Sequence, residues 1–463
     1  MTAMPSSSLP AALFEALAAI FPGDALRCDE PTRLAYGYDN SRRTAPADAV
    51  AFPHRHEQVV ALVQACREHR VPVIARGRGT NTTGATVPTA GGVVVSFERM
   101  NRILRIVPED RIAVVEPGLL NGDLQRALAA HGFFWPPDPT SAPYCTVGGN
   151  LACNAGGPRT VKYGATRENV LALRAVAGSG AELRCGTPTT KGATGYDLVR
   201  LLVGSEGTLA LITGATLKLV PKPGAVATLR AAYVDVDAAA RAVARIMAQP
   251  ATPCALEFLD DASLALARAH RDGAAVPEAG ALLLIEVDGA PETLDAAVAA
   301  VSRAARGDGL LELRAAADAA EAEALWAVRK ALSPALRSLS PQKINEDVVV
   351  PVSRVPELVA VAKALSARHG LPIVCFGHAG NGNLHVNLLP RDARERAAAE
   401  PCLSELFDAV IRLDGTLSGE HGIGLAKREF MTRALDPGAL ALMHGIKAAF
   451  DPDGILNPGK LLP

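Results

Sequence analysis

The stretch that most restricts how this chain can fold is residues 371–387, an apolar run, then Asn381-Gly382, then a second run of alternating character. Asn-Gly between two such runs is the strongest short-range signal for a β-hairpin, because both residues tolerate the positive φ angles of a type I′ turn. A two-residue turn here predicts that His378 pairs with His385. The two imidazoles would then face each other on one side of the ribbon, with Cβ atoms about 5 Å apart.

This hairpin face allows two interpretations. Asn387 lies on the same face, one pair further along, because side chains alternate along a strand. Neutral imidazoles at this separation can share one divalent cation. The alternative is a polar hairpin face on which the two histidines are merely solvated. Spacing alone leaves both interpretations open.

The size and charge of the chain limit its class of function. Its 463 residues are enough for two or three domains with separate cores. A net charge of -1 gives no reason to expect nucleic acid or an anionic membrane surface as a partner. No apolar run approaches the ~20 residues that span a bilayer, and residues 1–10 lack the basic region of a secretory signal. We therefore expect a soluble globular protein without a transmembrane segment.

The cysteines indicate the compartment. The chain has 8 cysteines, and they are scattered without any Cys-x-x-Cys pair. This pattern argues against a structural zinc or iron–sulfur site and for a reducing environment. We expect a cytoplasmic location.

The chain divides into two blocks at the proline-punctuated residues 220–223. An N-terminal helical lead (1–45) with a helix at 11–21 precedes a first block (46–223) that is rich in Gly, Pro, Asn and Thr. The first block has expected strands at 71–75, 92–97, 112–116 and 209–219 and helices at 57–69 and 122–131. The second block (224–445) alternates strands (231–236, 281–288, 348–352) with Ala-rich helices (to 249, 292–306, 316–339), which predicts a mixed sheet covered by helices. A turn-rich return (446–463) is expected to pack on the first block.

Glycine-rich loops are concentrated in the first block. The loop at residues 76–84 follows a strand, but its third glycine comes too late for a dinucleotide fingerprint and no helix follows it. It also lacks the Lys-Ser/Thr ending of a P-loop. Its backbone N–H groups, hydroxyls and two arginines suit a diphosphate without a helix dipole, although a tight Gly-rich turn would explain this loop taken alone. Further loops at 136–157, 195–198 and 204–209 exceed what turns alone require.

These three loop regions resemble the flavin-binding domain of the vanillyl-alcohol oxidase/p-cresol methylhydroxylase superfamily. The hairpin, together with residues 418–424, resembles the branch that oxidises D-2-hydroxy acids, which includes D-lactate dehydrogenase, D-2-hydroxyglutarate dehydrogenase and the flavin subunit of glycolate oxidase. The resemblance runs from about residue 45 to the C-terminus. It implies an α+β fold, with a PCMH-type FAD-binding domain, a mixed α/β substrate (cap) domain and the C-terminal return.

The resemblance implies FAD as cofactor, and it assigns roles to residues of the glycine-rich loops. The pyrophosphate would be held by Arg76, Gly77, Arg78, Gly79, Thr80, Asn81, Thr82 and Gly84. The ribityl chain and isoalloxazine would be lined by Asp138, Thr140, Thr146, Gly148, Gly149, Asn154 and Gly157. Glu206 and the strand through Ile212 would meet the adenosine side, and Asn457 would close the flavin end. Because the first loop has no histidine, we expect non-covalent FAD, with Cys145 a minor candidate for attachment.

The same resemblance implies a metal-dependent active site. His378, His385 and Glu420 match the family's ligands for a divalent metal (Zn, Mn or Fe), and His421 matches the base that takes the hydroxyl proton. Asn387 would contact the substrate. The substrate carboxylate needs a cation, and Arg329 with Ser333, one helical turn apart, matches the family's carboxylate-binding pair. The alternatives are a solvated loop pair for Glu420 and His421 and an exposed helical arginine for Arg329.

The expected reaction is oxidation of a D-2-hydroxy acid to the 2-oxo acid, with hydride passing to flavin N5. Hydroxyglutarate-type relatives carry Lys where this chain has Asn345, so D-lactate or a similar monocarboxylate is favoured over D-2-hydroxyglutarate. Electrons would leave for an external acceptor, namely a cytochrome, a quinone or an electron-transfer flavoprotein. Alternatives are the flavin subunit of a hetero-oligomeric glycolate oxidase and, ranked lower, a non-catalytic FAD-binding protein. The metal, the acceptor and the oligomeric state stay open, with a homodimer among the expected assemblies.

Overall fold

The computed structural model describes residues 9–270 and 276–463, so residues 1–8 of the expected N-terminal lead lie outside the described part. The chain forms two compact units. Of the described residues, the first unit comprises 9–157, 164–222 and 420–463, and the second comprises 158–163, 223–270 and 276–419. The main boundary at 222/223 is within one residue of the expected one. Two segments differ from the expectation: residues 420–445 pack with the first unit, and residues 158–163 pack with the second.

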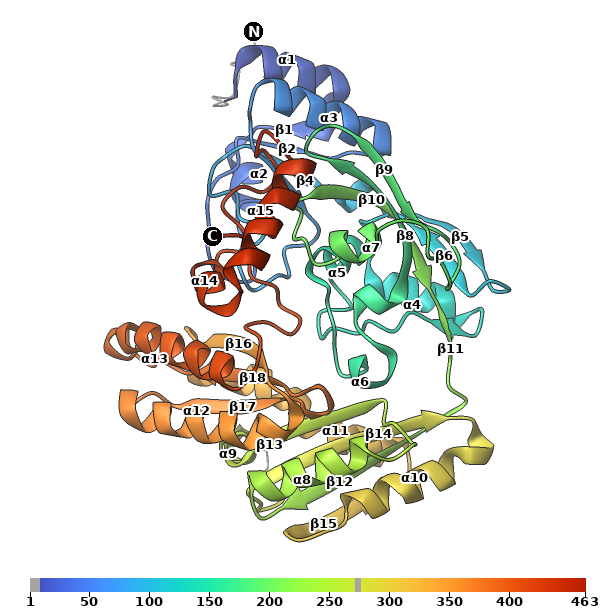
Figure 1. Ribbon diagram of the computed structural model, residues 1–463, viewed down its shortest axis with the longest axis vertical. Coiled ribbons are helices and arrows are strands. Elements are labelled where there is room, and N and C mark those ends of the chain that lie inside the picture. Colours follow the sequence, from blue (N-terminus) through green and yellow to red (C-terminus); the bar gives the residue numbers. More distant parts are fainter. Residues whose placement is uncertain (1–8, 271–275) are drawn as a thin grey trace. The chain divides into compact units, whose positions relative to one another are not determined.

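Within its described residues, the first unit combines three sheets with helices, and the smallest sheet is the pair β7 and β11 (Figure 1). A four-stranded sheet has the order β1-β2-β4-β3, and a five-stranded sheet has the order β5-β6-β10-β8-β9. Its strands are β1 (Leu26–Arg27), β2 (Ala49–Ala51), β3 (Val73–Arg76), β4 (Val93–Ser96), β5 (Ile103–Val107), β6 (Ile112–Val115), β7 (Phe133–Phe134), β8 (Val170–Ala177), β9 (Glu182–Gly186), β10 (Ala210–Lys218) and β11 (Val220–Pro221). Its helices are α1 (Ala11–Ile20), α2 (Glu30–Ala35), α3 (His56–Glu68), α4 (Asn121–Ala129), α5 (Val147–Cys153), α7 (Leu198–Leu202), α14 (Met431–Ala434) and α15 (Pro437–Phe450).

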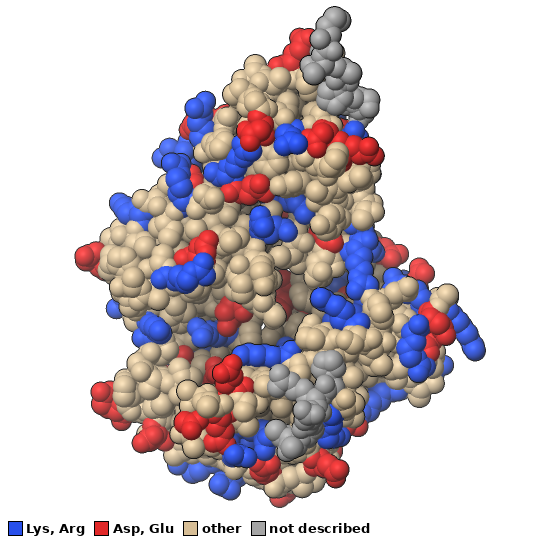
Figure 2. Space-filling view, turned by 180° about the vertical axis from the view of Figure 1, so that it is seen from behind, with Lys and Arg blue, Asp and Glu red and all other residues tan. Residues whose placement is uncertain are grey.

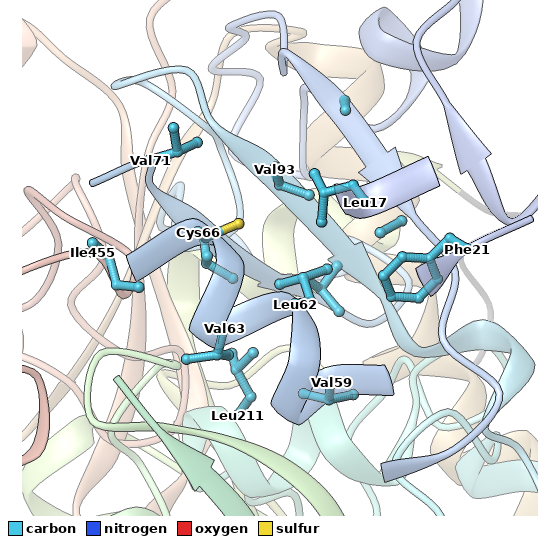
Figure 3. Packing of buried hydrophobic residues seen from close by; sticks show 14 of the residues in the cluster. Leu17, Phe21, Val59, Leu62, Val63, Cys66, Val71, Val93, Leu211 and Ile455 are labelled. Atoms are coloured by element: carbon cyan, nitrogen blue, oxygen red, sulfur yellow. The ribbon is translucent and has the colours of Figure 1, made fainter. Parts of the chain in front are cut away.

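The N-terminal helix and the C-terminal return share one core. Helix α3 presents Val59, Leu62 and Cys66 at helical spacing, and these buried side chains pack with Leu17 of α1 (Figure 3). Ile455 of the return joins the same cluster. Its carbonyl accepts a hydrogen bond of 2.8 Å from the Val73 N–H, which fixes the return beside β3. The C-terminal segment therefore packs on the first unit.

The second unit is one seven-stranded sheet of order β15-β12-β14-β13-β17-β18-β16 with helices on both faces (Figure 1). Its strands are β12 (Ala225–Tyr233), β13 (Ala255–Asp260), β14 (Ala281–Gly289), β15 (Leu310–Ala315), β16 (Ile344–Val349), β17 (Ile373–His378) and β18 (Asn383–Leu388). Its helices are α6 (Thr160–Tyr163), α8 (Val236–Met247), α9 (Asp261–His270), α10 (Pro291–Ala305), α11 (Ala319–Leu339), α12 (Val355–His369) and α13 (Ala393–Arg412). Helices α9 and α11 bury apolar side chains against one face of the sheet.

The α+β class is confirmed, but the expectation of a mixed second sheet was wrong. All six strand pairings in this sheet are antiparallel. Alternating strands and helices are typical of sheets with parallel strands, yet a helix can equally return the chain to an antiparallel neighbour. Strand β16 also begins at Ile344, four residues before the expected start at 348.

The hairpin forms, but not with the expected turn. Residues 379–382 form the loop, with a short 3₁₀ turn (Ala379–Asn381) and Gly382 at φ 68°. His378 therefore pairs with Asn383, and His385 pairs with Phe376, so the expected His378–His385 pairing was wrong. The register moved by two residues, and side-chain direction has a period of two, so both histidines still point to one face.

Within residues 9–270 and 276–463, no helix combines the length and the apolar character that crossing a bilayer requires. Figure 2 shows basic and acidic residues interspersed on the face seen from behind. This agrees with the balanced charge of the sequence.

Candidate functional site

The first glycine-rich loop offers its main chain to a ligand. It leaves β3 at Arg76, and among the described residues the N–H groups of residues 78–82 have no hydrogen-bond partner. The side chain of Asn81 folds the loop, since its Oδ1 accepts from the Thr83 N–H (2.8 Å) and the Ala85 N–H (3.3 Å). Consecutive unpaired N–H groups in a turn form a concavity suited to an anion.

Arg76 is built into the wall of this loop. Its Nη1 donates to the Tyr38 carbonyl at 2.6 Å, and its guanidinium lies over the Tyr36 ring at 5.4 Å from the centroid. Only 6% of the residue is exposed, whereas Arg78 is exposed. Their contact with the pyrophosphate stays a prediction.

The second loop approaches the first so closely that only glycine fits. A Cβ at Gly77 would lie 2.5 Å from Oγ1 of Thr146, and that oxygen already accepts the Gly149 N–H at 3.1 Å as the N-cap of α5. At the far end of the loop, a Cβ at Gly157 would lie 2.5 Å from Oδ1 of Asp138. The glycines are therefore required because the side chains of Thr146 and Asp138 lie where a Cβ would stand.

The third loop completes the cluster. The Gly204 N–H donates to Leu151 O (2.9 Å) and the Glu206 N–H to Ala152 O (2.8 Å), which ties this loop to α5. Asn457 Nδ2 donates to Glu206 O (2.7 Å) and to Ala85 O (2.9 Å), so the C-terminal return holds the first and third loops together.

Other residues expected around the flavin belong to the same unit. Gly84 and Ile212 are buried; Thr80, Thr82, Asp138, Gly148, Gly149 and Asn154 are half-buried; and Thr140 is exposed. Asn154 adopts φ 51° and accepts the Arg167 N–H at 2.9 Å. The expected FAD residues thus come from segments that the structure brings together, and the donor-rich first loop suits a diphosphate. Cys145 is 2% exposed and burial raises the pKa of its thiol, which disfavours the thiolate that attachment would need.

The second unit places the two histidines on one face of its sheet. The ring centroids of His378 and His385 are 5.3 Å apart, and both residues are 6% exposed. Nδ1 of His378 is hydrogen-bonded to Oε1 of Glu257, its partner across β13 and β17. A carboxylate on one ring nitrogen orients the imidazole and leaves the other nitrogen for a metal, as in most histidine metal sites.

Glu257 also binds the arginine that was expected to bind substrate. Arg329 Nε on α11 donates to Oε2 of Glu257 at 2.8 Å, and the guanidinium lies over Phe376, 4.5 Å from the ring centroid. Burial alone would raise the pKa of Glu257, but the charges and hydrogen bonds of His378 and Arg329 outweigh it and lower the pKa to about 2. Among the described residues, the two Nη atoms of Arg329 have no hydrogen-bond partner. They remain available to a carboxylate.

Asn387 lies two residues beyond His385 on the same face and is fully buried. Its Nδ2 donates to His385 O (3.0 Å), while its Oδ1 has no partner among the described residues. Asn345 is its cross-strand neighbour on β16. Ser333, one turn after Arg329 on α11, is half-buried.

The third expected metal ligand follows directly after the second unit. The Gly419 N–H donates to Asp347 Oδ2 at 2.8 Å, and Asp347 pairs with His385 across β16 and β18. Glu420 is the next residue, and ligand atoms of His378, His385 and Glu420 lie within 4.8 Å of one another. Two imidazoles and a carboxylate form a donor set that suits Zn, Mn or Fe and leaves positions open for substrate.

Glu257 was missed by the sequence analysis. It stands in the middle of the apolar strand Ala255–Asp260 and is completely buried. Buried glutamates are almost always paired, so a lone Glu in an apolar strand was a usable signal. The sequence could not show which residues it would pair with, because Arg329 and His378 are 72 and 121 residues away.

Comparisons with known proteins identify two families along the chain. Residues 47–186 match the family described as FAD binding domain, and residues 222–461 match FAD linked oxidases, C-terminal domain. The chain is 40% identical to glycolate oxidase subunit GlcD of Bacillus subtilis (strain 168) over 434 residues, covering 93% of this chain and 92% of GlcD. It is 34% identical to a D-lactate dehydrogenase of Anaerostipes hadrus, covering 88% and 87%. In fold it matches p-cresol methylhydroxylase with a TM-score of 0.80 at 18% identity, covering 98% and 97%. The chain therefore belongs to the FAD-linked oxidase family and is an FAD-dependent oxidoreductase.

Proposed function

We propose that this protein oxidises a D-2-hydroxy acid, with D-lactate as the best candidate, and that it needs a divalent metal as well as FAD. The observation that carries the proposal is the arrangement around His378. One of its ring nitrogens is fixed by a buried carboxylate, and a second imidazole and a second carboxylate supply ligand atoms within 4.8 Å. A solvated hairpin face would not require a fully buried Glu257.

Each residue of the site has a task in this reaction. The Nη atoms of Arg329 bind the substrate carboxylate in a planar fork, while Glu257 holds the guanidinium from its Nε side. Asn387 accepts a hydrogen bond through its buried Oδ1, and Ser333 lies one turn from Arg329 to assist in orienting the carboxylate. His421, directly after Glu420, takes the hydroxyl proton.

The two cofactors supply what the side chains lack. FAD held by the loops of the first unit would accept the hydride, and a divalent cation held by His378, His385 and Glu420 would lower the pKa of the substrate hydroxyl.

D-Lactate is favoured over a dicarboxylate by the uncharged Asn345. It is the cross-strand partner of Asn387, so it lies next to the proposed substrate contact. An amide there provides no charge for a second carboxylate.

An anaerobic flavin-bleaching experiment tests the proposal. The holoenzyme is mixed with D- and L-lactate, glycolate and D-2-hydroxyglutarate, with and without a chelator. We expect bleaching by D-lactate, slower bleaching by D-2-hydroxyglutarate, suppression by the chelator and near-complete loss in His421→Ala. Bleaching by L-lactate that is indifferent to chelator would contradict the mechanism. An unchanged spectrum with every acid would support a non-catalytic FAD-binding protein.

A second candidate is suggested by the 40% identity to a protein named as a glycolate oxidase subunit. If this chain also works only within a hetero-oligomer, the purified protein will bind FAD but turn over poorly with an artificial acceptor. Turnover with D-lactate by the isolated chain, faster than with glycolate, would exclude this candidate.

A further inference from the structure

The loop that carries His421 is held by the glycine-rich loops of the first unit. Residues 421–426 have no regular secondary structure, so the position of His421 depends on what the surrounding main chain contacts. Asn81 Nδ2 donates to the His421 carbonyl at 3.0 Å. Thr83 O accepts the Leu425 N–H (2.8 Å) and the Ala426 N–H (3.0 Å).

The strongest of these contacts comes from Glu206. Its Oε1 accepts the Ile423 N–H at 2.6 Å, and its Oε2 accepts the Gly424 N–H at 2.8 Å. Glu206 is only 5% exposed, so a carboxylate has been buried for these two bonds. At 2.6 and 2.8 Å, both contacts are at the short end of the range for N–H···O hydrogen bonds.

The backbone conformation of Glu206 is itself held by several hydrogen bonds. It adopts φ 53°, which residues with a Cβ rarely do. The Ala152 carbonyl accepts its N–H, and Asn457 Nδ2 donates to its carbonyl. An unusual conformation that several partners enforce is typical of functional sites.

We propose that Glu206 is a positioning residue, whose carboxylate fixes the backbone of residues 423–424 and so holds the imidazole of His421 in its working position. Asn81 anchors the other side of His421 through the carbonyl. The inference depends on the role of His421 given above. It assigns to Glu206 a task distinct from contact with adenosine, which the sequence resemblance implied.

The test compares Glu206→Gln with Glu116→Gln. Glu116 is also buried, lies in the same unit and accepts a backbone N–H, that of Arg102 at 2.9 Å, but it contacts no residue of the 421–426 loop among those described. A glutamine at position 206 keeps the shape but offers an acceptor at only one of the two oxygen positions, because its Nε2 is a donor. FAD content and Tm are measured first to verify that both variants fold.

Two readouts follow. In hydrogen–deuterium exchange of the holoenzyme, the amides of Ile423 and Gly424 should exchange on the order of tenfold faster in Glu206→Gln and at the wild-type rate in Glu116→Gln. In anaerobic single-turnover reduction by D-lactate, Glu206→Gln should slow flavin bleaching on the order of tenfold, while Glu116→Gln leaves it unchanged.

A double-mutant cycle distinguishes positioning from a separate effect on the flavin. In the His421→Ala background, Glu206→Gln should cause no further loss, because the residue it positions has been removed. An equal fold-loss in both backgrounds, or wild-type exchange at residues 423–424, overturns the inference.

If His421→Ala itself bleaches at the wild-type rate, the proposed function falls and this inference with it. If His421→Ala is inactive and Glu206→Gln is fully active, only this inference falls.

A second variant covers the case in which Glu206→Gln does not fold. A Cβ at Gly422 would lie 2.6 Å from Oε1 of Glu206. Gly422→Ala should therefore displace the same carboxylate, with added strain from φ 85° at this position, and give faster exchange at residues 423–424. Unchanged exchange in this variant would overturn the inference.

Discussion

The two units differ in the groups that they offer to ligands. In the first unit, mainly backbone groups on loops are expected to hold the flavin. In the second unit, side chains on strands and on a long helix are expected to hold metal and substrate. The N–H groups of residues 78–82 and the close approach of Gly77 to Thr146 typify the first unit. His378, His385 and Glu257 on adjacent strands, with Arg329 on α11, typify the second.

The difference follows from what each ligand requires. A long diphosphate-bearing cofactor is met by many main-chain donors, so glycine is needed where a Cβ would block the approach of a neighbouring loop. A small substrate with one carboxylate and one hydroxyl needs a few groups at fixed positions, and strands hold side chains more rigidly than loops do. Variants in the second unit should therefore abolish chemistry without releasing FAD, and variants in the first should release FAD.

The largest effect is expected for His385→Ala. Loss of one imidazole should remove the metal and lower the rate of flavin reduction by D-lactate on the order of 10³-fold, because a bound cation supplies several kcal/mol of charge stabilisation. Elemental analysis and stopped-flow absorbance measure the two quantities, and FAD content should not change. His369→Ala, which removes a histidine paired with Glu405 in the same unit, serves as the control. Full activity of metal-free His385→Ala would contradict the metal site.

Arg329→Lys should raise the KM for D-lactate by roughly 10- to 100-fold with a smaller change in kcat. An ammonium cannot form the planar double contact that a guanidinium makes with a carboxylate. Arg337→Lys on the exposed side of the same helix should leave both constants unchanged. An unaltered KM in Arg329→Lys would place the substrate carboxylate elsewhere.

Gly77→Ala tests the first unit. The new methyl would lie 2.5 Å from Thr146 Oγ1, and moving that oxygen would break the cap of α5. We expect about tenfold weaker FAD binding, measured by fluorescence titration of the apoprotein, with little effect on metal content. Gly445→Ala on α15, where a Cβ meets nothing within 4 Å, is the matched control. If Gly77→Ala retains FAD fully, the close approach of the two loops is not needed for binding.

The smallest expected effect is on the pH dependence of thermal stability. Burial raises the pKa of Glu206 to about 7, although the Ile423 and Gly424 N–H groups, Lys427 and Lys460 lower it in part. A carboxyl whose pKa in the folded state exceeds its ordinary value of 4.5 gives its full stabilisation of the folded state below pH 4.5. This stabilisation is lost as the pH rises through about 7, the pKa of Glu206 in the folded state. Between pH 5 and 8, the Tm of the wild type should therefore fall by a few degrees relative to that of Glu206→Gln. Parallel Tm curves would show that Glu206 does not titrate in this range.

Much of the fold could be read from local patterns. The expected helix at 57–69 corresponds to α3 (His56–Glu68), and the expected strand at 281–288 corresponds to β14 (Ala281–Gly289), because apolar spacing and caps are local properties. The expected hairpin register was wrong by two residues, because the loop comprises the four residues 379–382 and not Asn381-Gly382 alone. The face was nevertheless right, because a shift of two preserves side-chain direction.

Local sequence patterns could not show which unit each segment packs with. Residues 420–445 were expected with the second block but pack with the first unit, and residues 158–163 do the reverse. In the second case, Lys162 and Tyr163 bind Asp288 on β14. Such placements depend on partners more than a hundred residues away, which no local pattern specifies.

By itself, the sequence determined the residue types of the site, the alternation that puts both histidines on one face, and the glycines that let loops approach one another. These are consequences of backbone geometry within a few residues. Only the tertiary structure decided that Glu257 would orient both His378 and Arg329, and that Glu206 would hold the loop of His421. The physical reason is that a buried charge must find a partner, and which partner it finds depends on how distant segments pack.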